Sequence, residues 1–491
     1  MQNTTTRYNF FFNANNTLNE VIAQAKSQHQ DDFTTLLPFY NYSLENTSAN
    51  RLQLDSIISR SSTGLVLHDL RNGQLRRCKA MGFGEAELDA LKHPALISVL
   101  ANASVSWCSV TVNREVLQRL LNQAQDVEKE IATVDRMLRL GASTASSFRE
   151  RWALFWANHF TVSGAKELTA VMVGPFEQEV IRPYAFGRFE DMLVASTTHP
   201  AMLTYLDQAQ SVGPGSLAGA RNGRRGLNEN LAREILELHT IGIEAGYSQA
   251  DVTEFARALT GFSVGREDED RAGQFVFREN IHEPGARTLL GKAYRPDQLG
   301  QGVAILKDLA AHPATARHVA FKIARHFVAD DPPPALVARL EQSFLKSGGR
   351  LDRVALTLVE APEAWEPAAT KFKTPYEFLI SSWRLIGAQP SAFERITVPL
   401  IGLGQRGFSP PSPKGWSDMA GEWCSPDGLI KRLQWSQAFA AVVADKLDPN
   451  EAASAALGAR LTAPTAQAVA RAETRREAIA LLLMSPEFQR R

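Results

Sequence analysis

Residues 227–241 concentrate side chains that can do acid–base chemistry. Apolar residues recur there at steps of three and four, which is typical of one buried helix face: Leu227, Leu231, Ile235 and Leu238. Polar residues follow the neighbouring face: Asn230, Arg233, Glu234 and Glu237. One interpretation is a solvated face with local ion pairs such as Glu229 with Arg233, each contributing roughly 0.2–0.5 kcal/mol. The alternative is that these side chains line an interior cleft.

Two histidines elsewhere in the chain could complete a site with this helix. His159 shares a predicted helical face with Trp152 and Trp156, where a histidine is more often a satisfied core residue than a ligand. His282 precedes Glu283 in a predicted turn. A histidine next to a carboxylate in a turn is a fair candidate for a site, although this pattern has low specificity.

The free energy needed to bury a charge suggests that these residues interact with one another. A buried carboxylate is unfavourable unless it is paired or coordinates a cation. Arg233 can neutralise one neighbouring glutamate, which leaves Glu234 without a cationic partner on its own helix. The imidazoles of His159 and His282 could act with Glu234 as an acid–base pair, or as ligands of a zinc- or iron-like divalent metal. A buried ion-pair network without chemistry is the alternative. The sequence thus predicts three metal ligands, His159, Glu234 and His282, and five catalytic residues, Glu234, His159, His282, Arg233 and Glu229.

Other motifs give weaker indications of a functional site. The helix that ends near Val328 has a basic face that could bind an anion, dock an acidic partner or simply be solvated: His318, Lys322, Arg325 and His326. Residues 211–226 are rich in glycine and arginine but lack Walker A spacing, so a flexible loop is predicted. The GxSxG match at 261–265 and the GxGxxG match at 402–407 both lack the strand–turn–helix context that their chemistry needs.

The elements that must position these residues are predicted to be mostly helices. Apolar spacing of three and four indicates helices over residues 114–140, 146–160, 176–194, 249–260, 300–310, 313–328, 334–346, 350–360, 375–387, 427–445, 451–457 and 464–484. Ser248 is a predicted N-cap. Residues 274–277 and 287–290 are expected to pair as a small ribbon. The predicted fold class is all-α: a large, irregular multi-helix assembly with a minor β-ribbon.

Composition narrows the class of protein. The 491 residues carry 53 basic and 53 acidic side chains, a balance that argues against broad nucleic-acid binding. The three cysteines form no CxxC pair, so a zinc ribbon is not expected. The longest apolar runs have seven residues, too short for a transmembrane segment. The N-terminus has no recognisable export signal, which predicts a soluble, cytoplasmic protein.

Composition also changes near residue 73. Residues 1–72 contain ten asparagines, whereas the other 419 residues contain nine. The first segment is therefore either an appendage with its own surface chemistry or a piece of different origin. The predicted domains are an N-terminal appendage (1–73), a helical lead-in (74–146), a helical core (147–390) and a C-terminal helical part of the same core (391–491).

Several long segments resemble one bacterial family in its order along the chain, the family called domain of unknown function 1800. They are residues 151–163 (RWALFWANHFTVS), 174–214, 226–264, 312–340, 403–416 (LGQRGFSPPSPKGW) and 481–491 (LLLMSPEFQRR). The resemblance runs from about residue 147 to the C-terminus. Residues 1–72 do not look like the N-terminus of the family.

The resemblance implies a helical protein whose activity is not established. Its relatives are often exported, so a periplasmic location is the alternative to a cytoplasmic one. Their genes often lie beside one for an alkaline-phosphatase-like protein. The family motifs fall on Asn158, His159, Asn228, Glu229, Asn230, Arg233, Glu234, His239 and His282. The family usually has His-Asp at the last position, where this chain has His282 followed by Glu283.

Three functional classes remain open from the sequence. The first is an enzyme, a hydrolase that uses a metal or acid–base chemistry. The second is a partner or chaperone-like module for the co-encoded alkaline-phosphatase-like protein. The third is a structural or surface-associated helical protein. A buried cluster of Glu234, His159 and His282 would favour the first class, and a large exposed apolar groove would favour the second.

Overall fold

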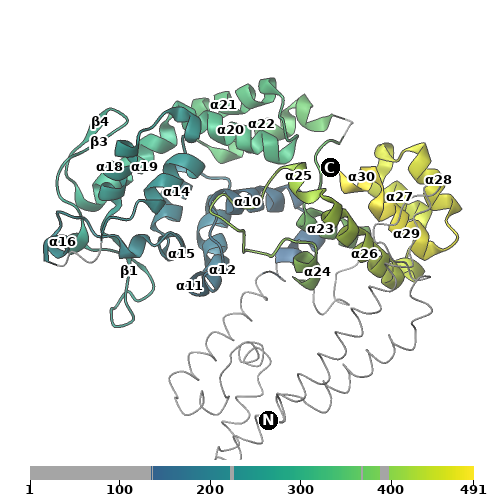
Figure 1. The fold of residues 1–491 in the computed structure, drawn as a ribbon. Helices are drawn as coiled ribbons and strands as arrows, with labels where there is room; N and C mark the ends of the chain where they lie inside the picture. The colour runs from purple at the N-terminus through teal and green to yellow at the C-terminus, as the bar shows by residue number, and fades with distance from the viewer. Residues whose placement is uncertain (1–133, 135–136, 222–225, 367–368, 387–396) are drawn as a thin grey trace, which may run out of the picture. The chain divides into compact units, whose positions relative to one another are not determined.

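The computed structural model describes residues 134, 137–221, 226–366, 369–386 and 397–491. The chain divides into two units, Met1–Gln125 and Asp126–Arg491, and every described residue belongs to the second. Helices dominate this part, and its strands form two small two-stranded antiparallel sheets (Figure 1). The predicted all-α fold class is therefore confirmed. None of these helices combines the length and the apolar character that crossing a bilayer requires.

A first hydrophobic core is built by helices from the first half of the described chain. The α-helices between residues 147 and 360, all of which except α11 and α16 contribute to this core, are α10 (Ser147–His159), α11 (Glu167–Ala170), α12 (Val173–Phe176), α13 (Arg182–Tyr184), α14 (Phe189–Thr198), α15 (Pro200–Tyr205), α16 (Leu217–Arg221), α17 (Asn230–Glu234), α18 (Gln249–Leu259), α19 (Gln298–Ala311), α20 (Pro313–Phe327), α21 (Pro334–Ser347) and α22 (Leu351–Glu360). Two π-helical stretches, η2 (Glu177–Ile181) and η4 (Ile235–His239), continue α12 and α17. Short 3-10 turns connect these elements: η3 (Gln208–Gln210), η5 (Ile243–Ala245), η6 (Glu279–Ile281) and η7 (Pro362–Trp365). Helices α20, α21 and α22 pack side by side in sequence order (Figure 1).

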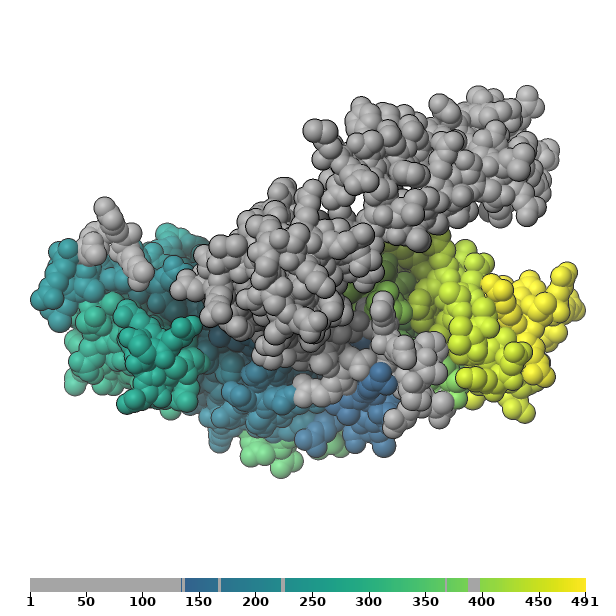
Figure 2. Space-filling model, turned by 90° about the horizontal axis from the view of Figure 1, so that it is seen from below, coloured from purple at the N-terminus to yellow at the C-terminus, as the bar shows by residue number. Residues whose placement is uncertain are grey.

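A second core gathers the later helices. These are α23 (Pro375–Leu385), α24 (Thr397–Gly402), α25 (Ala420–Trp423), α26 (Pro426–Val443), α27 (Pro449–Leu457), α28 (Ala463–Arg471), α29 (Arg475–Met484) and α30 (Pro486–Gln489), with the turns η8 (Ala444–Lys446) and η9 (Gly458–Arg460). Helix α29 packs against α26 and α28. The residues of these helices form the yellow-green to yellow region of Figure 2.

Local sequence explains where several helices begin. Ser248 forms a capping box with Asp251 at the start of α18, so the predicted N-cap is confirmed. His312 precedes Pro313, and its Nδ1 accepts the backbone N–H of Ala314 at 3.1 Å, which satisfies one of the free N–H groups at the start of α20. Thr374 caps α23 through a capping box with Glu377.

The helix predicted over residues 227–241 is shorter and partly different. The structure begins it at Asn230 as α17 and continues it as the π-helix η4 over Ile235–His239. A π-helix takes one more residue per turn, so it rotates the face that follows. As a result Leu236 and His239 are buried where the 3.6-residue period predicted Leu238.

The two predicted strands exist but do not pair with each other. β2 (Phe275–Phe277) pairs with β1 (Phe262–Val264), and β3 (Arg287–Leu289) pairs with β4 (Lys292–Tyr294). The second pairing is a tight hairpin, because Leu290 and Gly291 both have positive φ. That conformation belongs to the two-residue turns that suit the twist of antiparallel strands. The prediction of one ribbon from residues 274–277 and 287–290 is therefore wrong.

The aromatic face of α10 is the centre of the first core. Trp152, Trp156 and Phe160 are all 0% exposed, as their spacing predicts. The indole N–H of Trp152 donates to the carbonyl of Ala185 at 2.7 Å, so burying it leaves no unsatisfied donor there.

We expect the substitution Trp156→Ala to lower the free energy of unfolding by about 3–5 kcal/mol, because it leaves a large cavity in a packed core. Urea denaturation followed by circular dichroism measures the change. Trp365, which is 68% exposed, provides the matched control, and Trp365→Ala should cost less than about 1 kcal/mol. Equal effects of the two substitutions would contradict the assignment of Trp156 to the core.

Candidate functional site

His159 lies inside the aromatic core and not in a cavity. It is 2% exposed, and its Nε2 lies 3.1 Å from the carbonyl oxygen of His239. Its Nδ1 is buried without a hydrogen-bond partner in the described part of the chain. Burial holds the pKa of His159 well below its usual value, with positive Lys322 nearby adding to the effect. The ring is therefore neutral and structural in this fold.

Glu229 and Arg233 form the ion pair that their spacing predicts, with 3.2 Å between Nη2 and Oε2. Glu229 also accepts hydrogen bonds from Thr253 at 2.7 Å and from Gln249 at 2.8 Å, and these bonds lower its pKa, that from Thr253 most. Both partners lie in α18. Glu229 thus ties the beginning of α17 to the neighbouring helix.

Glu234 is half-buried and lies near Tyr205, a residue of α15. Burial raises the pKa of Glu234, and the negative charge of Glu237 raises it further. Within the described residues its carboxylate takes part in no hydrogen bond or ion pair.

His282 and Glu283 hold a turn against neighbouring loops. Nδ1 of His282 lies 2.7 Å from the carbonyl oxygen of Thr260, so it donates there. Glu283 accepts the backbone N–H of Gly215 at 2.6 Å, which attaches the glycine-rich loop to this turn. The pair therefore has a clear structural role.

The predicted metal centre has no counterpart in the described structure. In that part of the chain, no three His, Cys, Asp or Glu side chains are grouped as metal ligands. His159 and His282 each direct a ring nitrogen to a backbone carbonyl, that of His239 and that of Thr260. We therefore do not propose His159, Glu234 and His282 as the ligands of a metal ion.

A different group of polar residues surrounds two adjoining cavities near the start of α10 and α23. The larger has a volume of about 410 Å³ and the smaller about 130 Å³. Arg151, Tyr376 and Glu377 line both. The cavities therefore share one polar wall, which joins α10 and α23.

The C-terminal residues help to build this wall. Residues 371–373 run antiparallel to residues 489–491, with a bridge between Phe372 and Arg490. The N–H of Lys373 donates to Gln489, and the N–H of Arg491 donates to Lys371, at 2.9 and 2.8 Å. This pairing places the side chains of Lys373 and Arg491 at the larger cavity.

Glu377 is the central charge of the wall. Its Oε1 lies 2.6 Å from Nε of Arg491 and 3.6 Å from Nη2 of Arg151, and its Oε2 accepts the backbone N–H of Thr374 at 3.0 Å. Burial alone would raise the pKa of this carboxyl, but the two arginines outweigh it and lower the pKa to about 2. Glu377 is therefore ionised at neutral pH.

The larger cavity has an excess of positive charge. Five cationic side chains and two carboxylates line it: Arg151, Lys373, Arg384, Arg460 and Arg491, with Glu150 and Glu377. Both carboxylates already have partners. Glu150 makes a bidentate pair with Arg182 at 2.7 and 2.9 Å, and Glu377 contacts Arg491 at 2.6 Å. Within the described residues, the side chains of Lys373 and Arg460 have no hydrogen bond or ion pair.

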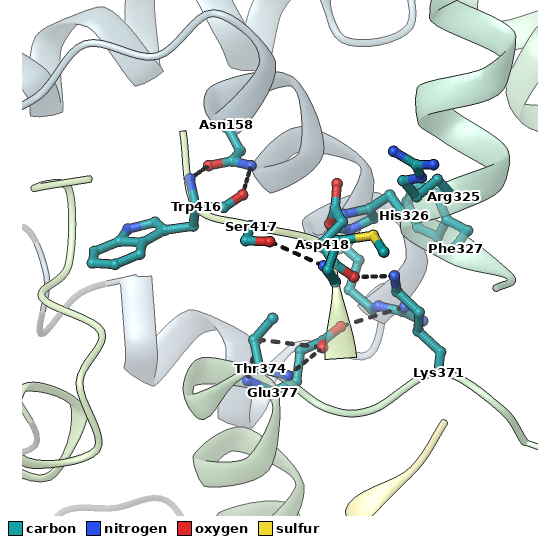
Figure 3. A network of polar contacts seen from close by, with 12 residues as sticks. Asn158, Arg325, His326, Phe327, Lys371, Thr374, Glu377, Trp416, Ser417 and Asp418 are labelled. Atoms are coloured by element: carbon teal, nitrogen blue, oxygen red, sulfur yellow. Dashed lines mark hydrogen bonds and ion pairs between the residues drawn. The ribbon is translucent and has the colours of Figure 1, made fainter. Parts of the chain in front are cut away.

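The smaller cavity contains a histidine–aspartate pair. Asp418 accepts a hydrogen bond from Nδ1 of His326 at 2.6 Å (Figure 3). Burial would raise the pKa of Asp418, but the charge and hydrogen bond of His326 lower it. Because a carboxylate only accepts, Nδ1 carries a proton, and in the neutral form of the ring Nε2 is then the acceptor.

The loop that carries Asp418 is fixed from two sides. The Asn158 amide pairs with the backbone of Trp416, accepting its N–H at 2.7 Å and donating to its carbonyl at 2.9 Å (Figure 3). Gly415 has φ +83°, and a Cβ there would lie 2.5 Å from Oδ1 of Asn158. On the other side, Lys371 donates to the carbonyl of Asp418.

The structure also locates the side chains that sequence reasoning missed. His326 was identified only as part of a basic face, and Asn158 only through the family motif. The capping-box spacing of Thr374 and Glu377 could have been found, but it indicates a helix start and not a buried charge. Nothing in the sequence places Arg491 beside Glu377.

The chain also matches a known protein family. Residues 13–490 match the family described as "Protein of unknown function (DUF1800)". The chain belongs to this family. No protein among the curated proteins and no solved structure matches it significantly.

The match corrects one expectation. It begins at residue 13, so the prediction that residues 1–72 lie outside the family is wrong. A local excess of asparagine therefore does not decide whether a segment belongs to the family. Residues 1–133, with Cys78 and Cys108, lie outside the described part, and Cys424 is a free thiol. The four predicted domain divisions remain predictions.

The buried histidines predict how stability responds to acid. Burial, followed by the charge of Lys322, lowers the pKa of His239 to about 3 and that of His318 to about 4. These values lie below the unfolded value of about 6.5, so their contribution to stability is complete above pH 6.5 and is lost as the pH falls toward 4. We expect a loss of about 1–2 kcal/mol per histidine between pH 6.5 and 5.

Urea unfolding across this pH range tests the prediction. His239→Gln should flatten the dependence of unfolding free energy on pH. Leu236→Ala is the control, because it removes buried apolar volume without removing a titrating group and should lower stability equally at each pH. A slope that His239→Gln leaves unchanged would show that protonation of His239 does not contribute.

Proposed function

We propose that the protein binds a small organic anion, carrying carboxylate or phosphate groups, in the larger cavity. The observation that carries this proposal is the excess of cationic side chains around a volume of about 410 Å³. Buried or half-buried cations without counterions cost free energy in the empty protein. A bound anion would recover that cost through charge-assisted hydrogen bonds, which are about twice as strong as neutral ones.

The two kinds of wall in this cavity suit an organic ligand better than a bare ion. Its apolar side includes Ile380, Leu385, Ala455, Ala456 and Phe488. Ligand sites typically combine mostly apolar walls with a few charged groups that fix orientation. A molecule with an anionic end and a short carbon body fits this division.

Arg460 is the best cation with which to test the proposal, because no described contact gives it a structural role. We expect Arg460→Gln to weaken the binding of small anions about tenfold, which corresponds to about 1.4 kcal/mol. Inorganic phosphate and citrate are suitable probes, with binding measured by calorimetry and by the rise in melting temperature.

Arg339→Gln is the matched control for Arg460→Gln. Arg339 is an exposed arginine, paired with Glu363 at 3.0 Å, and does not line the cavity. The control should bind phosphate and citrate like the unchanged protein. Equal binding by all three proteins would contradict an anion site in the larger cavity.

A second candidate function is hydrolysis, and the His326–Asp418 pair is the observation that favours it. Asp418 fixes the tautomer in which Nε2 can take a proton from water. The hydroxide formed could attack an ester or phosphoester whose anionic end lies in the neighbouring cavity. His326 and Asp418 thus replace His159, Glu234 and His282 as the proposed acid–base residues.

Hydrolysis of a panel of p-nitrophenyl esters and phosphates tests this candidate. General-base catalysis contributes about 10²–10⁴-fold, so His326→Gln should lower kcat by that factor. Anion binding should be retained, because His326 does not line the larger cavity. Full activity of His326→Gln, or no turnover of any substrate in the panel by the unchanged protein, would contradict the hydrolase proposal.

The partner and structural classes have less support from the described surface. A docking site would show as a large contiguous apolar patch. The most exposed large apolar side chains lie instead on four separate elements: Leu217, Ile243, Trp365 and Val398. A role beside an alkaline-phosphatase-like protein therefore ranks below ligand binding.

A further inference from the structure

Lys373 is a buried amine with an unusual lack of partners. Its backbone is fixed on both sides, by the N–H bond to Gln489 and by Arg432, which donates to its carbonyl at 2.7 Å. The residue is 7% exposed, and it lines the larger cavity. Its Nζ lies 4.2 Å from the centre of the Phe488 ring, and within the described residues it makes no hydrogen bond or ion pair.

Lys371, two residues earlier, shows what a structural lysine looks like here. It is 2% exposed, and its Nζ pairs with Asp330 at 2.5 Å and donates to the carbonyl of Asp418. Its charge is therefore neutralised and its protons are used. Lys373 has a similar degree of burial but no such partners, so its amine is available to the cavity.

The surroundings of Lys373 favour the neutral amine. Burial lowers its pKa most, and the nearby charges of Arg460, Arg491 and Arg432 lower it further, while Glu377 opposes them. The result is a pKa of about 7, so a large fraction of the amine is unprotonated at neutral pH. A neutral lysine amine beside other cations is the form that attacks carbonyl carbons.

We propose that Lys373 forms an imine with the carbonyl group of the anion that the larger cavity binds. The ligand class is then an aldehyde or 2-oxo acid whose phosphate or carboxylate contacts the cavity arginines. This inference rests on the proposed anion site and adds the covalent step and the substrate class to it.

The step needs no further reactant. The nitrogen lone pair attacks the carbonyl carbon, and the electron pair of the C=O bond moves to oxygen. The carbinolamine that results loses its oxygen as water, which carries away both hydrogens of the amine. One C=N bond has then replaced one C=O bond, and no oxidation or reduction has occurred.

Pyridoxal 5'-phosphate is a suitable probe because it joins an aldehyde to a phosphate. The full-length protein is incubated with it at pH 7, reduced with sodium borohydride and digested, and each lysine is scored by mass spectrometry. We expect Lys373 to be labelled at least tenfold faster than Lys371, the exposed Lys307 and the half-exposed Lys431. Lys373→Arg, which keeps the charge, should abolish the fast phase, and circular dichroism checks that it folds.

Two comparisons separate the covalent step from the anion site. Pyridoxal, which lacks the phosphate, should label Lys373 at least tenfold more slowly, and inorganic phosphate should protect it. Absence of fast labelling at Lys373, with phosphate still bound in a manner sensitive to Arg460→Gln, would overturn the imine and leave the anion site standing. Fast labelling by both aldehydes alike, with no effect of phosphate or of Arg460→Gln, would overturn the anionic ligand class.

Discussion

The rest of the site depends on the ion pairs of Glu377, whose side chain is 12% exposed. Glu377 belongs to α23, and it contacts Arg151 from α10 and Arg491 from the last position of the chain. Three segments far apart in the sequence are thus joined at one charge. Removing one partner of a buried ion pair typically costs about 3–5 kcal/mol, because the other charge is left uncompensated. The walls of both cavities include Arg151 and Glu377, so their shape follows from this arrangement.

The fold separates two kinds of buried titratable group. In the first core, His159 and His239 are neutral, since burial lowers the pKa of each and no carboxylate of the described residues contacts them. At the cavities it is the carboxylates that are charged and partnered: Glu377 contacts Arg491, and Asp418 accepts a hydrogen bond from His326. A neutral imidazole can pack among aromatic rings without a counterion, whereas a charge needs an opposite charge or hydrogen bonds. This difference is the reason why the proposed chemistry lies at the cavities and not at His159.

Local patterns in the sequence predicted the fold better than the site. Trp152 and Trp156 could be assigned to the core because helical spacing alone places them on one face, and the Glu229–Arg233 pair follows from the same geometry. The burial of Leu236 could not be predicted, since a π-helix changes the period within the segment. The site depends on contacts between distant residues: Asn158 and Trp416 are 258 positions apart. Residue type also does not reveal which of two nearby lysines has a counterion. Lys371 pairs with a carboxylate and Lys373 lies over an aromatic ring, and only their three-dimensional neighbours make this difference.

Among the described residues, the basic side chains of Lys373 and Arg460 line the larger cavity without an ion-pair partner, which is difficult to explain by stability alone. A protein selected only for folding would be expected to pair Lys373 or to replace it with an apolar residue, since a buried ion pair is often no better than well-packed hydrophobic side chains. Instead the cations around this cavity outnumber its carboxylates, and both carboxylates are already engaged. Charges without counterions raise the free energy of the empty protein, and a ligand of opposite charge would lower it again on binding. A binding site can use this arrangement, because the free energy that folding loses then adds to the affinity for the ligand. The basic side chains that raise the free energy of the unliganded protein therefore also define the proposed ligand: they set its charge and its reactivity.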